Sequence, residues 1–175
     1  IHKLQSTTIS HRTRSQMGWT PERHFVVGNV EYTPHGPKLA PPASTVRHLA
    51  PWFEQKGSLD VWRDIISTYN TPGMEPLGFA FLVGAGSPLL QLLDAPQVKG
   101  GVLHLVSNES GSGKTSVQLA INSLFGDPSR MLLGEKDTAN AKVQTMGMFN
   151  SIAVTIDEIT AMEPAEISDL VYGAT

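Results

Sequence analysis

The sequence predicts an α/β fold with a three-layer core, in which helices cover both faces of a parallel sheet. An apolar run over residues 102–106 is followed by a Gly/Ser loop and then by apolar residues at helical spacing. A second run, Ser151–Ile156, is rich in β-branched residues and is followed directly by an acidic pair. Strand, loop, helix and a further strand are the units from which parallel sheets are built.

The loop has the composition of a phosphate-binding loop. The apolar run before it predicts a largely buried strand, and Lys114 and Thr115 follow the loop where a helix begins. Backbone N–H groups in such a loop, and the positive end of the helix dipole, would bind an anion. We expect Lys114 to reach the terminal phosphates of a nucleotide and the Thr115 hydroxyl to hold a magnesium ion. The expected nucleotide-binding residues are Asn108, Glu109, Ser110, Gly111, Ser112, Gly113, Lys114, Thr115 and Ser116.

The loop departs from the usual pattern at one position. That pattern has a glycine five positions before Gly113, where this chain has Asn108. Asparagine tolerates a left-handed backbone better than other non-glycine residues, so the departure is compatible with the loop. The alternative is a Gly/Ser loop that ends in Lys-Thr by chance.

Asp157 and Glu158 follow the run Ser151–Ile156 and supply the acidic groups that nucleotide hydrolysis needs. Ligands of open parallel sheets bind beyond the carboxyl ends of the strands. We expect Asp157 to hold the magnesium ion through its water shell, and Glu158 to orient or deprotonate an attacking water. In the alternative, Asp157 caps a helix and Glu158 lies in its first turn. Together with the loop, the pair predicts an NTP hydrolase with ATP and Mg²⁺ as cofactors.

The composition sets limits on the class of protein. The chain has 175 residues, of which 40% are hydrophobic, as expected for one domain or a domain with a small appendage. It has no apolar run near the roughly 20 residues needed to span a bilayer, so we expect no membrane partner. Cysteine is absent, which excludes disulfides and thiolate metal sites and suits a cytoplasmic location. The chain lacks an initiator Met and a signal peptide, so we expect a processed or excised fragment.

The net charge of −3 gives the chain no general attraction for nucleic acid. A small basic group at His11, Arg12 and Arg14 suits a solvated strand face better than a DNA contact. DNA binding would therefore depend on local basic residues or on parts outside this chain.

Residues 1–43 are expected to form a β-rich subdomain. The runs Phe25–Val27 and Val30–Tyr32 flank Gly28-Asn29, which predicts a tight hairpin. Thr33–Pro42 carries four prolines in ten residues and predicts a linker or an extended surface segment.

Residues 44–98 are expected to form a helical segment. Ser58 would cap a helix that ends near Tyr69, with Trp62 as a core anchor. Because Leu77–Val83 is apolar nearly all round, it predicts a buried helix. Shorter helices are expected at residues 44–47, with a restart at Pro51, and at 87–93.

Residues 99–175 are expected to form the first part of the ATPase core, incomplete at its C-terminal end. The helix after the loop should end at Gly126, and the helix Thr138–Phe149 should turn Val143 and Met146 inward. A strand is expected at residues 131–133, and a further helix at 164–172. The strand before the loop and the strand before Asp157 should be neighbours, as in compact AAA+ and superfamily-3 helicase ATPases.

These segments resemble a known family. The chain is similar, over nearly its whole length, to the helicase-type ATPase domain of phage and plasmid primase–helicases, a domain labelled as one of unknown function. The matching segments are GSLDVWRDIISTYN, PLGFAFLVGAGSPLLQLL, GGVLHLVSNESGSGKT, SIAVTIDEI and DLVYGAT, with Gly18-Trp19 and Phe25-Val26-Val27-Gly28 in the β-rich part. The resemblance implies a P-loop NTPase core of the AAA+/superfamily-3 type. It also implies a DNA-unwinding or DNA-translocating motor that acts as a homo-oligomeric ring in phage or plasmid replication, in the cytoplasm of a bacterial host. A primase or polymerase module is a possible partner.

The resemblance places the nucleotide site on Gly113, Lys114, Thr115, Asp157 and Glu158. The family's sensor position and arginine finger do not fall within these residues, so we expect this chain alone to bind nucleotide weakly and hydrolyse it slowly. The alternative is a nucleotide-gated assembly or DNA-binding module without significant turnover. A small-molecule kinase is disfavoured because no arginine-rich lid follows the loop.

Overall fold

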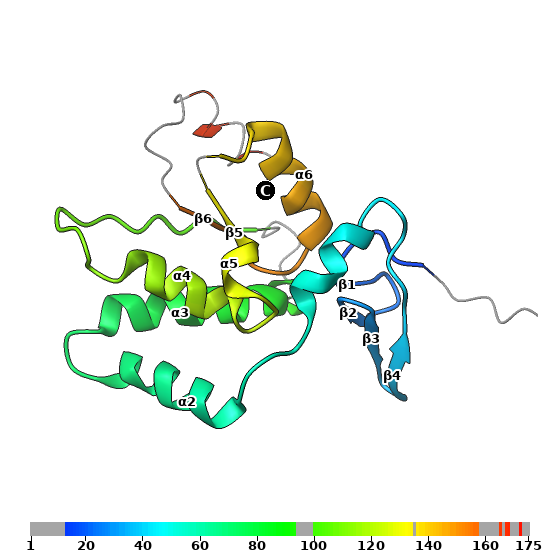
Figure 1. Cartoon of the computed structure of the whole chain (residues 1–175), viewed down its shortest axis with the longest axis horizontal. Coiled ribbons are helices and arrows are strands. Elements are labelled where there is room, and N and C mark those ends of the chain that lie inside the picture. The colour runs from blue at the N-terminus through cyan, green and yellow to red at the C-terminus, as the bar shows by residue number, and fades with distance from the viewer. Residues whose placement is uncertain are drawn as a thin grey trace, which may run out of the picture.

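The computed structural model describes residues 13–93, 100–134 and 136–157, together with residues 165, 167–168 and 172. It has a mixed α/β architecture, as the sequence predicts, but its larger sheet is antiparallel. This sheet has four strands, the parallel sheet described has two, and helices make up much of the rest (Figure 1). The predicted helix at residues 164–172 lies largely outside the described residues.

The antiparallel sheet lies at one end of the molecule. Its strands, in spatial order, are β1 (Gly18–Trp19), β2 (Phe25–Val27), β3 (Val30–Thr33) and β4 (Gly36–Leu39). The predicted hairpin is confirmed, because Val27 pairs with Val30 across a turn in which Gly28 has a φ of 61°. The Pro-rich segment is extended, as predicted, but it is not a linker, since its residues Gly36–Leu39 pair with β3. Pro37 is tolerated there because β4 is an edge strand, where a missing donor breaks no ladder.

Within the described residues, two α-helices and three short 3₁₀ helices connect this sheet to the second half of the chain. They are η1 (Arg47–Phe53), α2 (Leu59–Ser67), η2 (Thr68–Asn70), α3 (Glu75–Gly86) and η3 (Ser87–Leu92). The turns η1, η2 and η3 are 3₁₀ helices, and Pro51 lies inside η1 rather than restarting a helix. Ser58 occupies the predicted N-cap position of α2, but its side chain makes no capping hydrogen bond.

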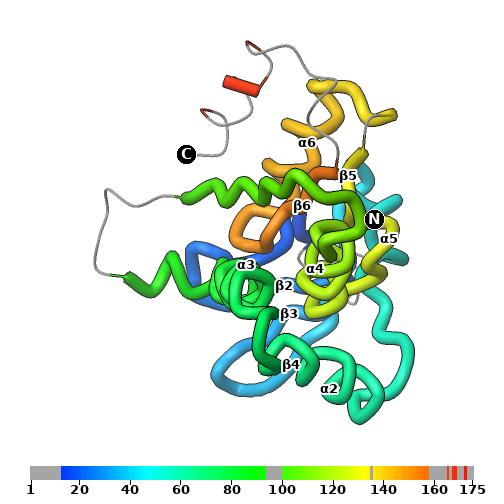
Figure 2. The backbone as a smooth tube through the Cα atoms, turned by 90° about the vertical axis from the view of Figure 1, so that its left-hand side faces the viewer, coloured from blue at the N-terminus to red at the C-terminus, as the bar shows by residue number. Residues whose placement is uncertain are grey.

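The prediction that the apolar helix at residues 77–83 is buried is wrong for one of its faces. Ala80, Phe81 and Gly84 of α3 are buried, whereas Phe79 and Leu82 are 61% and 68% exposed. The buried face packs on α4 (Lys114–Asn122), and the two helices lie side by side in both views (Figures 1 and 2). Uniform apolarity therefore did not imply burial on all sides: α3 packs against α4 and η2, and its residues Phe79 and Leu82 stay exposed.

The second half of the chain contains the parallel pair. After α4 come α5 (Pro128–Met131), β5 (Leu132–Leu133), α6 (Ala139–Phe149) and β6 (Thr155–Ile156). The pairs Leu132–Thr155 and Leu133–Ile156 set the parallel register of β5 and β6. Both strands are shorter than the runs that predict them.

The inward face predicted for α6 is wrong for Val143, whereas Met146 is half-buried. Lys142, Thr145 and Phe149 are buried, whereas Val143 is 44% exposed. Phe149 determines the orientation, since its ring packs edge-on against Trp52 and Phe53 of η1. This aromatic contact lies far away in sequence, so the pattern within α6 could not predict it.

The buried strand predicted before the loop is also wrong. Residues 101–107 form no strand, and Val102 and Val106 are 59% and 75% exposed. The segment passes close to β6 in both views (Figures 1 and 2), and Leu105 packs against a core cluster. The neighbour of β6 within the described residues is β5, so the expected pairing of the two site strands is wrong as well. An apolar run becomes a buried strand only when other strands and helices cover both of its faces.

Two hydrophobic clusters hold the molecule together. The first joins the antiparallel sheet, η1 and the second half of the chain, and contains Met17, Val26, Val46, Leu49, Phe53, Met131, Phe149 and Ile152. The second lies between α3 and α4 and contains Ala80, Phe81, Val117, Ala120 and Ile121. Trp62 is a core anchor, as predicted, because it packs against the second cluster and its Nε1 donates to Ser123 Oγ at 2.8 Å.

The first cluster is closed by a tight backbone contact at Gly126. The predicted helix end at Gly126 is wrong, since α4 ends at Asn122, and the φ of Gly126 is not positive. A Cβ at this position would collide with the carbonyl of Trp52 and lie 3.0 Å from Phe53 Cα. Asp127 N also donates to Trp52 O at 2.6 Å. Glycine is therefore required for close approach to η1 rather than for a left-handed helix end.

We predict that Gly126→Ala destabilises the chain by about 1–3 kcal/mol, the usual cost of forcing extra volume into a packed interior. Gly147→Ala is the matched control, because a Cβ there meets nothing within 4 Å and the residue lies within α6. Urea unfolding of both variants measures the difference. Equal stabilities for the two variants would contradict the close contact at Gly126.

A charged cluster stiffens the antiparallel sheet. Glu31 is 8% exposed, and its carboxylate accepts two hydrogen bonds from Arg14, at 2.7 and 3.1 Å. His24 Nδ1 lies 2.6 Å from the same carboxylate. The hydrogen bonds from Arg14 lower the pKa of Glu31 despite the opposing effect of burial, and His24 adds to the lowering.

We predict that Glu31→Gln lowers the free energy of unfolding by about 1–3 kcal/mol at pH 7, because the Arg14 charge loses its partner. Since the pKa of folded Glu31 is below its ordinary value of 4.5, the carboxylate stabilises the fold above that pH and loses this effect as the pH falls through the lowered pKa. Urea unfolding at pH 7 and pH 3 should show the difference from wild type shrinking at pH 3. The exposed Glu54→Gln variant, whose partner Lys56 is 3.7 Å away, is the control and should change little at either pH.

Candidate functional site

The predicted loop leads into the N-terminus of α4. Gly111 and Gly113 have φ values of 75° and 87°, which favour glycine, and Gly113 is the residue that precedes the helix. No side chain caps this helix end. The first N–H groups of α4, which have no partner within the helix, can therefore donate to an anion placed over the loop.

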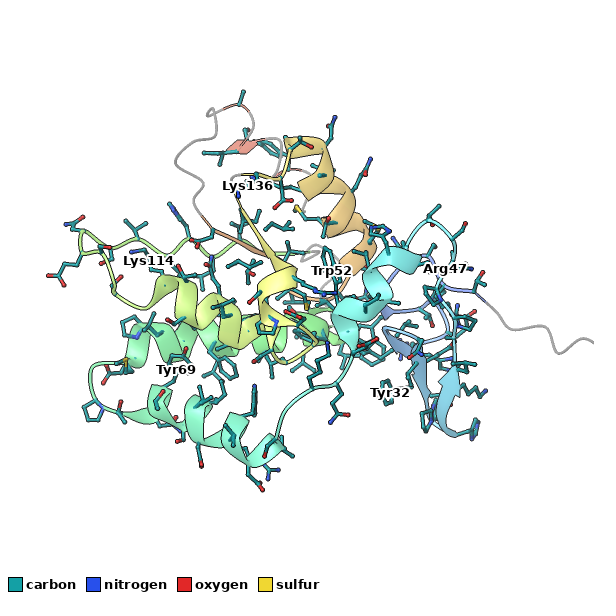
Figure 3. All side chains as sticks on the ribbon, in the orientation of Figure 1. Tyr32, Arg47, Trp52, Tyr69, Lys114 and Lys136 are labelled. Carbon is teal, nitrogen blue, oxygen red and sulfur yellow. The ribbon has the colours of Figure 1, made fainter. Side chains whose placement is uncertain are left out.

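Lys114, the first residue of α4, folds back over the loop. Its Nζ lies 3.1 Å from Ser112 Oγ and 3.5 Å from the backbone oxygen of Glu109. Figure 3 shows Lys114 beside the loop at this end of the helix. The ammonium group is thus held above the turn in which the two left-handed glycines lie.

The start of the loop has an ordinary backbone. Asn108 does not have a positive φ, so the left-handed conformation that would have justified asparagine there is absent. The residue replaces a glycine without backbone strain. Asn108, Glu109, Ser110 and Ser116 are all exposed, and Ser107 Oγ accepts from the backbone N–H of Glu109 at 3.1 Å.

Thr115 and Asp157 meet although they are 42 positions apart. Thr115 Oγ1 donates to Asp157 Oδ2 at 3.1 Å. The backbone N–H of Asp157 donates to Leu133 O of β5 at 2.8 Å, which fixes the residue at the end of the parallel pair. The structure therefore brings these two predicted residues together at the end of α4 where Lys114 lies. Glu158, the predicted water-orienting carboxylate, lies outside the described residues.

A hydroxyl and a carboxylate at this separation offer two oxygen atoms to a cation. Mg²⁺ is usually held by one or two protein oxygens, with waters and substrate phosphates filling its other positions. No group of three or more His, Cys, Asp or Glu that could hold a metal occurs in the part of the chain that the structure describes. The site thus suits a hydrated ion that arrives with its phosphates better than a metal held by the protein alone.

Two polar residues of α4 that the sequence analysis did not identify also face β6. Gln118 Nε2 donates to Ile156 O at 2.8 Å, and Asn122, which is fully buried, accepts from Thr155 Oγ1 at 2.9 Å. Both follow Thr115 at helical spacing, at the third and seventh positions. That spacing, on a helix face that meets the core, is a signal by which they could have been found.

The antiparallel sheet docks on the turn that leads into β6. Met17 N donates to Met148 O at 2.8 Å, and Asn150 Nδ2 donates to Trp19 O at 3.0 Å. Trp19 Nε1 also reaches Pro88 O of η3 at 2.7 Å. The sheet is thereby attached to the segment that leads into β6 and Asp157.

The comparisons with known proteins identify the family. A family model described as "Domain of unknown function (DUF927)" matches residues 1–174. The chain belongs to this family. No curated protein and no solved structure matches the chain. The DUF927 description assigns no activity, so the function has to be argued from the site itself. Among the described residues, no helix has the length and apolarity to cross a membrane.

We predict that Gly113→Ala destabilises the chain by about 1–2 kcal/mol, because its φ of 87° is unfavourable for alanine and its Cβ would lie 2.8 Å from Leu77 Cδ1. Gly101→Ala is the control, since that glycine has no positive φ and open space around it. Thermal or urea unfolding compares the two variants. A loss of stability in Gly113→Ala that is no larger than the loss in Gly101→Ala would contradict the loop geometry.

Proposed function

We propose that this DUF927 chain is a P-loop NTPase that binds ATP with Mg²⁺ and hydrolyses it, as part of a primase–helicase that unwinds or translocates DNA in phage or plasmid replication. The single observation that carries the proposal is the 3.1 Å contact between Thr115 and Asp157. A hydroxyl directly after Gly-Lys and a carboxylate at the end of a neighbouring strand are the two protein groups that hold magnesium in such enzymes.

The loop geometry supports phosphate binding. The left-handed glycines and the uncapped end of α4 suit a triphosphate, and the Lys114 ammonium lies within 3.5 Å of two loop oxygens. In the proposed complex a phosphate oxygen replaces Ser112 and Glu109 as the partner of Lys114, which gives a stronger, charge-assisted contact.

In the proposed reaction, Thr115 and Asp157 hold the magnesium ion and Lys114 neutralises charge on the terminal phosphates. Glu158, directly after Asp157 in sequence, orients or deprotonates the attacking water. Magnesium supplies further charge stabilisation when bound. The DNA contacts, proposed to lie largely outside this chain, the assembly of a homo-oligomeric ring and a primase or polymerase partner are proposed from the family resemblance. A cytoplasmic location in a bacterial host goes with that role.

We predict that Lys114→Ala weakens ATP binding roughly tenfold or more, since a hydrogen bond from a charged group contributes about 1.5–3 kcal/mol. Lys136→Ala, at another exposed lysine (Figure 3), is the matched control and should bind ATP as wild type does. Titration with a fluorescent ATP analogue in the presence of Mg²⁺ measures both variants. Equal affinities for the Lys114 and Lys136 variants would contradict the proposed site.

Glu158→Gln separates hydrolysis from binding. We predict that this variant binds ATP as wild type does and loses hydrolysis about 100-fold or more, the usual effect of removing a general base. Phosphate release measures the turnover of both proteins. Turnover that is unchanged by this substitution would favour the alternative, a nucleotide-gated module without significant hydrolysis of its own.

A further inference from the structure

One face of α4 contacts three consecutive residues at the end of β6. Positions 115, 118 and 122 follow one another at spacings of three and four, so their side chains lie on the same side of the helix. The three hydrogen bonds join Thr115 Oγ1 to Asp157 Oδ2 (3.1 Å), Gln118 Nε2 to Ile156 O (2.8 Å) and Thr155 Oγ1 to Asn122 Oδ1 (2.9 Å). Successive turns of the helix thus meet successive residues of the strand.

We infer that Gln118 is a positioning residue for magnesium, which fixes the Asp157 carboxylate at the distance from Thr115 that the ion needs. This inference rests on the proposed function and assigns a role to a residue outside the phosphate-binding motif. Gln118 itself touches neither nucleotide nor metal in this account.

The inference depends on the peptide unit that joins Ile156 to Asp157. Its carbonyl accepts from Gln118 Nε2 at 2.8 Å, and its N–H donates to Leu133 O at 2.8 Å. Because a peptide unit is planar and rigid, bonds at both of its ends fix its orientation. The Cα of Asp157 directly follows this unit, so the direction of its side chain is fixed by α4 on one side and β5 on the other.

The orientation of the Gln118 amide follows from its surroundings. Rotating the amide by 180° would place Oε1 against the carbonyl oxygen of Ile156, and two acceptors repel each other. In the observed orientation Oε1 is buried and has no partner within the described residues. A buried acceptor without a donor costs about 1–3 kcal/mol, which an apolar side chain of the same length would avoid. The polar residue is therefore disfavoured by packing alone, and its hydrogen bond to β6 accounts for its presence.

Asn122 fixes the other end of the contact. It is fully buried, accepts from Thr155 Oγ1 and donates to Pro128 O at 3.0 Å. It therefore joins β6 to the first residue of α5 as well as to α4. Because Asn122 lies in the core, its replacement would also affect folding, and Gln118 gives the cleaner test.

The experiment compares Gln118→Met with Gln144→Met. The first variant keeps the length of the side chain and removes the donor to β6, and the second changes an exposed glutamine of α6 in the same way. Binding of a fluorescent ATP analogue is titrated against Mg²⁺ and is also measured in EDTA. Gln118→Met should raise the Mg²⁺ concentration at half-saturation about tenfold, the usual cost of losing a group that orients a metal ligand. Its affinity in EDTA should stay within about twofold of wild type, and Gln144→Met should match wild type in both.

Gln118→Leu is a second variant that also lacks the donor and introduces no charge, and it should show the same rise. Two results would overturn the role of Gln118 but leave the proposed function intact. One is a Mg²⁺ dependence of nucleotide binding that is unchanged in both Gln118 variants. The other is an equal loss of nucleotide affinity with and without Mg²⁺. A wild-type chain whose nucleotide binding does not respond to Mg²⁺ would overturn the proposed function, and this inference with it.

Discussion

The approach of Thr115 to Asp157 is the contact on which the rest of the site depends. The two residues belong to elements that are 42 positions apart, and their side chains meet at 3.1 Å. This is possible only because α4 packs along β6 while β5 holds the N–H of Asp157 from the other side. A hydroxyl and a carboxylate brought together beside a lysine and an uncapped helix end are the groups on which the proposed binding of a hydrated cation with phosphates rests.

The remainder of the chain supports this contact from two directions. On one side, α3 packs against α4, and the absence of a side chain at Gly84 allows the helices to approach so closely that a Cβ there would meet Ile121. On the other, the antiparallel sheet binds the turn before β6 through Met17 and Trp19. The helical layer thus lies beside the site, whereas the antiparallel sheet lies at the other end of the molecule and holds the segment that leads into β6 (Figure 1).

The sequence predicted local features and the meeting of two candidate site residues better than the packing. The hairpin at Gly28-Asn29 and the helix after Gly113 follow from turn residues and local spacing, and the pairing of Thr115 with Asp157 follows from the spacing of two motifs. The exposure of residues 101–107 and the outer face of α3 could not be predicted, because periodicity shows which faces are apolar but not which neighbours cover them. The orientation of α6 depends on aromatic contacts of Phe149 with η1, nearly a hundred positions away. The role of Gln118 could not be predicted, because a single polar residue on a helix indicates a function only once the strand that it contacts is known.

The most direct test is a structure of the chain with Mg²⁺ and a non-hydrolysable ATP analogue. The proposed function predicts that the phosphates lie over the loop from Asn108 to Gly113, with the ion between the Thr115 hydroxyl and the Asp157 carboxylate, bound directly or through water. A nucleotide bound elsewhere, or an ion that contacts neither of these two residues, would contradict it.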